Sequence, residues 1–212
     1  MTRNISNRLL LYAITIENTE LKILLRQVEE TLSGGATILQ LREKSVDEEE
    51  YCRRAIEVKK ICDQYDVPLI IDDSINVALR CDAAGAHIGQ QDVNIECARK
   101  LLGADRIIGV SAKNVDQARR AEEGSADYLG VGAIYSTKTK KNPIYTSVDT
   151  LKEICASVSI PVVAIGGIKL NNITSLKGTG VVGAAIVTGI FSAPDVRQAT
   201  RDFRSKAEEL FA

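Results

Sequence analysis

The sequence predicts a single (β/α)8 barrel, an α/β fold in which eight parallel strands alternate with helices around a closed sheet. Along the 212 residues, a short apolar run gives way to polar or glycine-rich residues and then to a stretch with helical spacing, and this order recurs eight times. The runs are apolar throughout, as is typical of strands that helices cover on both faces. No linker or change in composition divides the chain, so we expect one domain over residues 1–212.

Each expected element follows from this alternation, taken in chain order. The first strand leads into a helix whose apolar residues recur at 3.6-residue spacing from Leu21 to Leu32, and Gly34–Gly35 ends it. The second strand leads into a long helix with Tyr51 and Cys62 on its apolar side. The strands are expected at residues 9–14, 36–41, 68–71, 86–88, 107–110, 128–131, 162–165 and 183–187.

The later helices are shorter, apart from the last, which follows Pro194 and buries Phe203 and Leu210. They are expected at residues 75–80, 95–102, 115–123, 148–157 and 170–176. Regular alternation of this kind implies parallel strands with right-handed crossovers. The alternative fold is an open doubly wound sheet, and eight units in so short a chain favour closure.

Composition excludes several classes of partner. A net charge of −1, an aromatic content of 4% and the lack of tryptophan offer nucleic acid neither a basic field nor a stacking surface. No apolar run approaches the roughly 20 residues of a membrane span. The apolar run near the N-terminus is short and has no small-residue cleavage site, which predicts a strand and not a signal peptide. Five scattered cysteines predict free thiols in a reducing cytoplasm.

Basic side chains follow the second strand. Because side chains alternate along a strand, Gln40, Arg42 and Lys44 point to one side and the leucines between them to the other. We expect the leucines to face the helices and the polar three to face the mouth of the barrel, where the strands end and such folds carry their active sites. A guanidinium and an ammonium there suit phosphate oxygens. The alternative is a surface salt-bridge cluster with Glu43.

Carboxylates follow the next two strands, as Asp72, Asp73 and Asp92. Oxygen ligands from neighbouring strand ends, together with substrate phosphate and water, are how Mg²⁺ is usually held. The alternative is that each aspartate caps the helix after it.

Hydroxyl and ammonium groups fill the longest expected loop, which follows the sixth strand and contains Thr137, Lys138, Thr139, Lys140 and Lys141. An isolated run of this kind would be a solvated charge cluster. Its place at the mouth of the barrel favours a contact with substrate.

Glycine pairs with small polar residues at the last two strand ends, Gly166–Gly167 and Val187–Thr188. Phosphate groups in such barrels often bind between these two loops, where glycine lets backbone N–H groups approach. His87 is the only histidine and lies inside the fourth strand, so we expect a packed or hydrogen-bonded strand residue and not a base. A lone histidine also argues against zinc sites and catalytic triads.

Together these motifs resemble thiamine phosphate synthases. The resemblance covers nearly the whole chain in one register and is carried by LYAIT, GATILQLREK, IIDD, GAHIGQQD, IIGVSAKN, ADYLGVGAIYSTKTKK, IPVVAIGGI and VTGIF. It implies a transferase of thiamine biosynthesis. The enzyme would join 4-amino-2-methyl-5-pyrimidinylmethyl diphosphate to a thiazole phosphate, or to its carboxylated form, and release pyrophosphate.

The resemblance also implies roles for individual residues. The pyrimidine diphosphate would contact Gln40, Leu41, Arg42, Glu43, Lys44, Asp72, Ser111 and Lys140. The thiazole phosphate would contact Thr137, Lys138, Thr139, Gly167, Val187 and Thr188. Asp73 and Asp92 would hold Mg²⁺, and the catalytic roles would fall to Arg42, Lys44, Ser111 and Lys140.

Four positions depart from the family's pattern. Asp72 stands where asparagine is usual, and Ile16 where an acidic residue is common. Lys138 occupies a position that usually carries a small or cyclic residue. Thr188 stands in a segment that usually bears serine, and it keeps the hydroxyl.

The expected chemistry is dissociative, because pyrophosphate leaves a benzylic-like carbon. Arg42, Lys44, Lys140 and Mg²⁺ would stabilise the departing charge, and the thiazole nitrogen would then attack the pyrimidine-methyl cation. The thiazole phosphate would act as an anchor that fixes the geometry of this attack. No general base is required.

Three other readings stay open from the sequence. A thiazole tautomerase on this fold uses a histidine in the loop after the sixth strand, where this chain has Ala133. A phosphosugar isomerase or decarboxylase is a second, and a sensor that binds both ligands without turnover is a third. The oligomeric state, a homo-oligomer included, also stays open.

Overall fold

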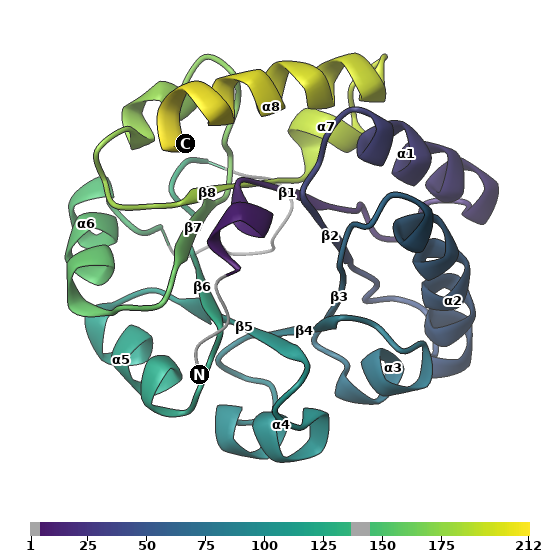
Figure 1. Ribbon diagram of the computed structural model, residues 1–212, viewed down its shortest axis with the longest axis horizontal. Coiled ribbons are helices and arrows are strands. Elements are labelled where there is room, and N and C mark those ends of the chain that lie inside the picture. The colour runs from purple at the N-terminus through teal and green to yellow at the C-terminus, as the bar shows by residue number, and fades with distance from the viewer. Residues whose placement is uncertain (1–4, 137–144) are drawn as a thin grey trace.

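The computed structural model describes residues 5–136 and 145–212, in which eight parallel strands close into a barrel in sequence order (Figure 1). This is the (β/α)8, or TIM, barrel that the alternation predicts. The strands are β1 (Leu11–Ile14), β2 (Ile38–Leu41), β3 (Leu69–Asp72), β4 (Gly85–Ile88), β5 (Ile107–Ala112), β6 (Tyr128–Val131), β7 (Val162–Ile165) and β8 (Gly183–Ile186).

Helices surround the barrel on its outer side (Figure 1). They are α1 (Leu21–Ser33), α2 (Glu48–Gln64), α3 (Ile75–Arg80), α4 (Ile95–Leu102), α5 (Val115–Glu123), α6 (Val148–Ser157), α7 (Thr188–Phe191) and α8 (Val196–Phe211). No helix in the described part of the chain is long and apolar enough to span a membrane.

Helices α3 to α6 begin and end at the residues predicted from the sequence, and each has a polar side chain at its N-cap. The caps are Ser74, Asn94, Asn114 and Ser147, whose side-chain oxygens accept a hydrogen bond from a backbone N–H in the first turn. Such a cap fixes where a helix begins, because it satisfies a donor that has no partner within the helix.

Four elements differ most from the expectation. The helix expected at residues 170–176 is a single 3-10 turn, η2 (Ile173–Leu176), because the Asn172 side chain accepts from Lys169 N and holds a turn there. A second 3-10 turn, η1 (Ser6–Leu9), precedes β1, and the short helix α7 follows β8 directly. Strand β5 extends to Ala112 and therefore includes Ser111.

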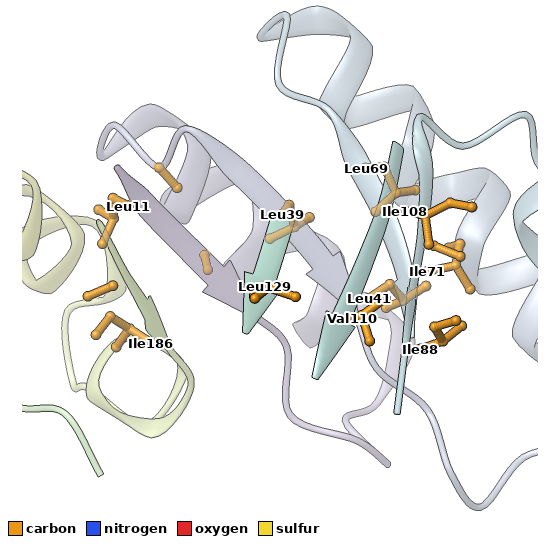
Figure 2. Packing of buried hydrophobic residues seen from close by; sticks show 14 of the residues in the cluster. Leu11, Leu39, Leu41, Leu69, Ile71, Ile88, Ile108, Val110, Leu129 and Ile186 are labelled. Atoms are coloured by element: carbon orange, nitrogen blue, oxygen red, sulfur yellow. The ribbon is translucent and has the colours of Figure 1, made fainter. Parts of the chain in front are cut away.

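Apolar residues form two separate clusters. The larger lies between the barrel and the helices and contains Leu39 and Leu41 of β2, as their alternation predicts (Figure 2). The smaller fills the barrel and includes Tyr12, Ile70 and Tyr128. Alternate side chains of each strand thus enter different cores, which leaves the strand ends free to carry polar groups.

Turn η1 covers the amino-terminal end of the barrel. Ile5 and Leu9 belong to the cluster inside the barrel, with exposures of 4% and 0%. Figure 1 shows this turn lying across the ring of strands. The interior is closed there, so access is from the opposite end.

Candidate active site

Two cations from the end of β2 meet carboxylates from the end of β3. Lys44 Nζ lies 3.3 Å from Asp72 Oδ2 and also forms an ion pair with Asp73. Arg42 Nε lies 3.7 Å from Asp72 Oδ2, and Arg42 Nη1 lies 3.2 Å from Glu17 Oε1 in the loop after β1. The predicted basic group is thus assembled at the carboxyl end of the barrel, with its charge compensated by acidic neighbours.

Asp72 is the centre of these contacts. Its carboxylate accepts a hydrogen bond of 2.5 Å from Gln40 Nε2, so the ends of β2 and β3 are joined by side chains as well as by backbone. Beneath them, the Tyr51 hydroxyl lies 2.8 Å from the carbonyl of Leu41 and 3.1 Å from that of Asp72. Burial raises the pKa of Tyr51 well above its ordinary value, so this hydroxyl stays a donor.

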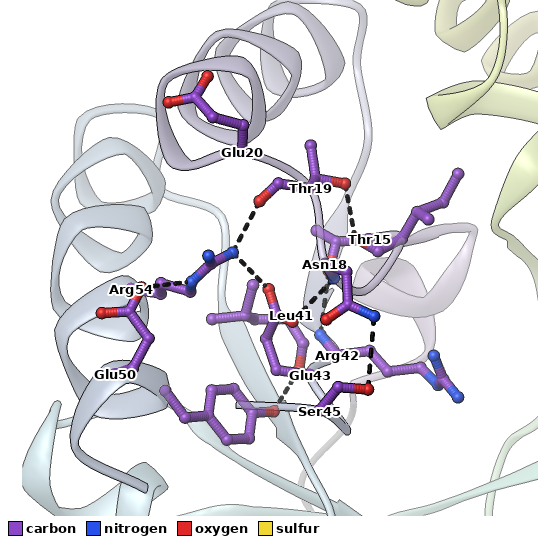
Figure 3. Close-up of polar contacts among 12 residues, drawn as sticks. Thr15, Asn18, Thr19, Glu20, Leu41, Arg42, Glu43, Ser45, Glu50 and Arg54 are labelled. Carbon is purple, nitrogen blue, oxygen red and sulfur yellow. Dashed lines mark hydrogen bonds and ion pairs between the residues drawn. The ribbon is translucent and has the colours of Figure 1, made fainter. Parts of the chain in front are cut away.

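Glu43 is buried and lies between Arg54 and Asn18 (Figure 3). Its side chain is fully buried, and its Oε1 lies 3.0 Å from Arg54 Nη1 of α2. Its Oε2 accepts a hydrogen bond of 3.0 Å from Asn18 N, and Arg54 Nη1 also donates to the carbonyl of Thr19 at 2.7 Å. Glu43 therefore joins the loops after β1 and β2 to helix α2.

The backbone of Arg42 is also held in place. Its N–H donates to Thr15 Oγ1 at 3.0 Å (Figure 3). Leu41, its neighbour, is fully buried against the helices, so only its backbone is near the mouth.

None of the three aspartates caps a helix. The side-chain caps of α3 and α4 are Ser74 and Asn94. Asp73 has a φ of 60°, in the left-handed region that few residues other than glycine adopt, and its N–H donates to the carbonyl of His87 at 2.8 Å. The alternative that these aspartates are helix caps is therefore wrong.

Asp73 and Asp92 line one surface hollow of about 420 Å³. Asp92 Oδ2 accepts from Gly89 N at 2.7 Å, which holds the turn after β4. The described residues contain no group of three or more His, Cys, Asp or Glu side chains arranged to bind a metal. The site therefore offers two carboxylates and not a complete protein cage.

Ser111 lies on β5 and faces His87 of β4. The Ser111 Oγ and His87 Nε2 are 2.9 Å apart, and His87 Nδ1 lies 3.0 Å from the Tyr128 hydroxyl. The prediction that His87 is a hydrogen-bonded strand residue is confirmed. Gln90 Nε2 donates to the Ser111 carbonyl at 2.7 Å, which ties the loop after β4 to β5.

The glycines after β7 pack against the loop after β6. Gly166 has φ 100° and Gly167 φ 65°, and a Cβ at Gly166 would lie 2.6 Å from Ala133 Cα. A Cβ at Gly167 would collide with the carbonyl oxygen of Ser136. Both positions require glycine for conformation and for space. Val187 lies between β8 and α7, and Thr188 is exposed at the first turn of α7.

Thr137, Lys138, Thr139 and Lys140 lie outside the described residues. Among the rest, three partners of the site were missed from the sequence. Glu17, in the loop after β1, lies next to Ile16 and forms an ion pair with Arg42. Arg54 lies on helix α2 and Tyr128 lies inside the barrel. Nothing in their local sequence shows what they contact.

Cations, carboxylates and glycines at the carboxyl end of a closed (β/α)8 barrel define a phosphate-binding barrel enzyme. The family model "Thiamine monophosphate synthase" matches residues 11–190. The chain belongs to this family and is a transferase of thiamine biosynthesis.

Individual relatives agree. The chain is 47% identical over 188 residues to thiamine-phosphate synthase 2 of Streptococcus pneumoniae, covering 89% of this chain and 90% of that one. It is 46% identical over 175 residues to the thiamine-phosphate synthase of Clostridium tetani, covering 82% and 84% of the two chains.

Solved structures show the same relation. Thiamine phosphate pyrophosphorylase from Pyrococcus furiosus superposes with a TM-score of 0.89 at 37% identity, covering 99% of this chain and 100% of that one. A 3-hexulose-6-phosphate synthase superposes with a TM-score of 0.74 at 16% identity, covering 92% and 98%, and this likeness shows the fold alone.

Proposed function

We propose that the chain acts as a thiamine-phosphate synthase that joins 4-amino-2-methyl-5-pyrimidinylmethyl diphosphate to a thiazole phosphate or its carboxylated form. The observation that carries the proposal is the cluster of Arg42 and Lys44 against Asp72 and Asp73 within a chain of this family. A diphosphate can take the place of these carboxylates as the partner of both cations, because its oxygens accept the same charged hydrogen bonds.

The pyrimidine diphosphate would bind along the ends of β2, β3 and β5. Arg42 and Lys44 supply the positive charge, Gln40 and Asp72 the polar partners of the pyrimidine, and Ser111 a hydroxyl. Leu41 and Glu43 would act through their neighbours, since the side chain of each is buried away from solvent. Lys140 remains a proposed contact from the loop after β6.

The thiazole phosphate would bind between the loops after β6, β7 and β8. Gly167, Val187 and Thr188 border this region, and Thr137, Lys138 and Thr139 are the proposed contacts from the loop after β6. Held there by its phosphate, the thiazole would present its nitrogen to the reacting carbon, and that fixed geometry is a large part of the rate gain.

Mg²⁺ is the proposed metal, with Asp73 and Asp92 as its protein ligands. The donor set fits, because Mg²⁺ commonly takes one or two carboxylates and completes its octahedron with substrate phosphate and water. When bound, the ion would neutralise charge on the diphosphate. Both carboxylates line one hollow, and one of them, Asp73, also forms an ion pair with Lys44, a proposed partner of the diphosphate.

The reaction needs charge stabilisation more than proton transfer. As the bond to pyrophosphate breaks, Arg42 and Lys44 hold the growing negative charge, and Ser111 can donate a hydrogen bond to a leaving oxygen. The thiazole nitrogen then forms the new bond to carbon. Ala133, buried at 8% exposure where a tautomerase would need its histidine, offers no proton shuttle.

The test is pyrophosphate release by the purified chain with both substrates and Mg²⁺, with and without EDTA. We expect release only when all three are present, and a fall of about 100-fold or more in kcat for Arg42→Ala and for Asp92→Ala. Arg26→Ala is the matched control, because the Arg26 side chain is 68% exposed on α1. Binding of both ligands without release would refute the synthase and leave a sensor.

A cytoplasmic location stays a prediction, and the oligomeric state, a homo-oligomer included, stays open. Small molecules are the expected substrates.

A further inference from the structure

Four side chains form one chain of hydrogen bonds from the barrel interior to the site. The Tyr12 and Tyr128 hydroxyls are 2.7 Å apart, Tyr128 Oη lies 3.0 Å from His87 Nδ1, and His87 Nε2 lies 2.9 Å from Ser111 Oγ. Tyr12 and Tyr128 are 1% and 0% exposed, while Ser111 is only partly buried. The series of hydrogen bonds thus runs from the buried Tyr12 to Ser111 at the mouth of the barrel.

The positions of the protons determine which group donates and which accepts in each of these hydrogen bonds. Burial raises the pKa of both tyrosines well above the ordinary value, so each hydroxyl keeps its one proton. Among the described residues, the Tyr12 hydroxyl has Tyr128 as its one hydrogen-bond partner. Its proton must therefore point to Tyr128, because a buried donor without an acceptor is costly.

The remaining bonds follow from that first one. If Tyr128 accepts from Tyr12, its own proton is directed at His87 Nδ1, which must then carry no proton. The neutral imidazole keeps its proton on Nε2 and donates to Ser111 Oγ. An imidazole protonated on Nδ1, whether neutral or cationic, would donate to the Tyr128 oxygen and leave one of the two phenol protons without an acceptor.

Two glycines provide the space for this arrangement. A Cβ at Gly109 would collide with the Tyr128 hydroxyl and lie 2.5 Å from His87 Nδ1. A Cβ at Gly130 would lie 3.0 Å from His87 Cε1. The neighbouring strands β5 and β6 therefore carry no side chain at the two points where the imidazole and the phenol meet.

We propose that His87 and Tyr128 are positioning residues that hold Ser111 as a hydrogen-bond donor toward the substrate's diphosphate. Because Ser111 Oγ accepts from His87 Nε2, its own proton is directed elsewhere, and the anionic oxygens at the mouth are its natural acceptor. The inference rests on the proposed function for the identity of the anion. The assignment of the tautomer does not depend on that function.

The first test reads the imidazole directly. His87 is the only histidine in the sequence, so a ¹⁵N-histidine-labelled protein without an affinity tag gives a single set of ring nitrogen signals. We expect a protonated Nε2 and an unprotonated Nδ1 at neutral pH, with or without substrates. A protonated Nδ1 would overturn the proposal, even if the chain proves to have no synthase activity.

The second test uses activity. Tyr128→Phe removes the donor to Nδ1 and is expected to lower kcat/KM about 10- to 100-fold, as expected for the loss of one hydrogen bond to a charged group. The loss should be absent when Tyr128→Phe is added to Ser111→Ala, because both changes act through the same bond. Equal losses in the two backgrounds would overturn the proposal.

Tyr12→Phe is the matched control. It removes the same atom from the same interior, one bond further from the imidazole, and leaves the Tyr128 hydroxyl as the donor to an unprotonated Nδ1. A smaller loss than that of Tyr128→Phe supports the assignment. The nitrogen signals of the unmodified protein keep the proposal falsifiable if a variant fails to fold.

Discussion

The carboxylate of Asp72 lies where the polar side chains of β2 converge. It accepts from Gln40, lies 3.3 Å from Lys44 Nζ and 3.7 Å from Arg42 Nε, and is only 8% exposed. Its negative charge orders the two cations before substrate arrives. The same charge opposes a diphosphate, so Asp72 both prepares the site and competes with its ligand.

Asp72→Asn is expected to lower the KM for the pyrimidine diphosphate. The amide oxygen can still accept from Gln40, while the removal of a nearby negative charge is worth of the order of 1 kcal/mol, or about fivefold. Asp66→Asn is the control, because Asp66 is exposed and paired with Arg8 away from the site. Steady-state kinetics with varied pyrimidine diphosphate decide the matter, and an unchanged or raised KM would contradict the prediction.

Sequence predicts the placement of single residues well where the signal is local. Alternation along β2 is enough to separate Arg42 and Lys44 from the leucines, and strand ends are enough to place the aspartates. The partners in space are not predictable in this way. Glu17 reaches Arg42 from another loop, and Arg54 reaches Glu43 from a helix face that its spacing does not distinguish from ordinary solvated surface.

The Glu43–Arg54 pair acts at the scale of elements, because it holds two loops of the mouth on helix α2. The Arg54 side chain is 13% exposed and also pairs with Glu50. Charges removed from water in this way depend on each other, since either one alone would be left without compensation.

Glu43→Ala is expected to lower the free energy of unfolding by about 3–5 kcal/mol, the usual cost of breaking a buried ion pair. Lys60→Ala breaks an exposed pair with Glu57 on the same helix and is expected to cost under about 1 kcal/mol. Urea unfolding measures both. Similar losses in the two variants would show that the buried pair contributes no more to the free energy of unfolding than the exposed one.

The loop after β7 provides a second test at this scale. Gly167→Ala places a methyl group against the Ser136 carbonyl and should displace the loop after β6, raising the KM for the thiazole phosphate about 10-fold or more. Gly178→Ala is the control, because Gly178 has a similar φ of 74° but no atom within 4 Å of the added Cβ. An equal KM for thiazole phosphate in the two variants would show that backbone strain at positive φ, and not the collision with Ser136, is responsible.

At the scale of the whole molecule, the fold follows from the sequence more completely than the site does. Eight strand–helix repeats determine a closed barrel, and N-cap residues fix helices α3 to α6 to the residue. What the repeats do not show is the content of the barrel. The pairing of Tyr12 with Tyr128 joins residues 116 positions apart, and it depends on glycines in strands whose pattern reads only as apolar.

These buried phenols predict how stability depends on pH. The pKa values of Tyr12, Tyr51 and Tyr128 are raised, chiefly by burial, above the ordinary value of about 10 that the unfolded chain retains. Their contribution is fully present below pH about 10 and is lost at higher pH, because the unfolded chain gives up these protons first. Phenolate absorbance should show these three of the six tyrosines ionising only as the chain unfolds. Ionisation of all six in the folded chain would contradict this.

The turn η1 has a practical consequence for anyone who modifies this protein. Ile5 and Leu9 close the end of the barrel, and both touch the cluster that contains the tyrosine pair. A fusion partner or truncation that displaces this turn would let water reach phenols that otherwise have each other as partners. A change at the amino-terminal end of the barrel would then alter the chemistry at the mouth, even though every residue of the mouth is intact.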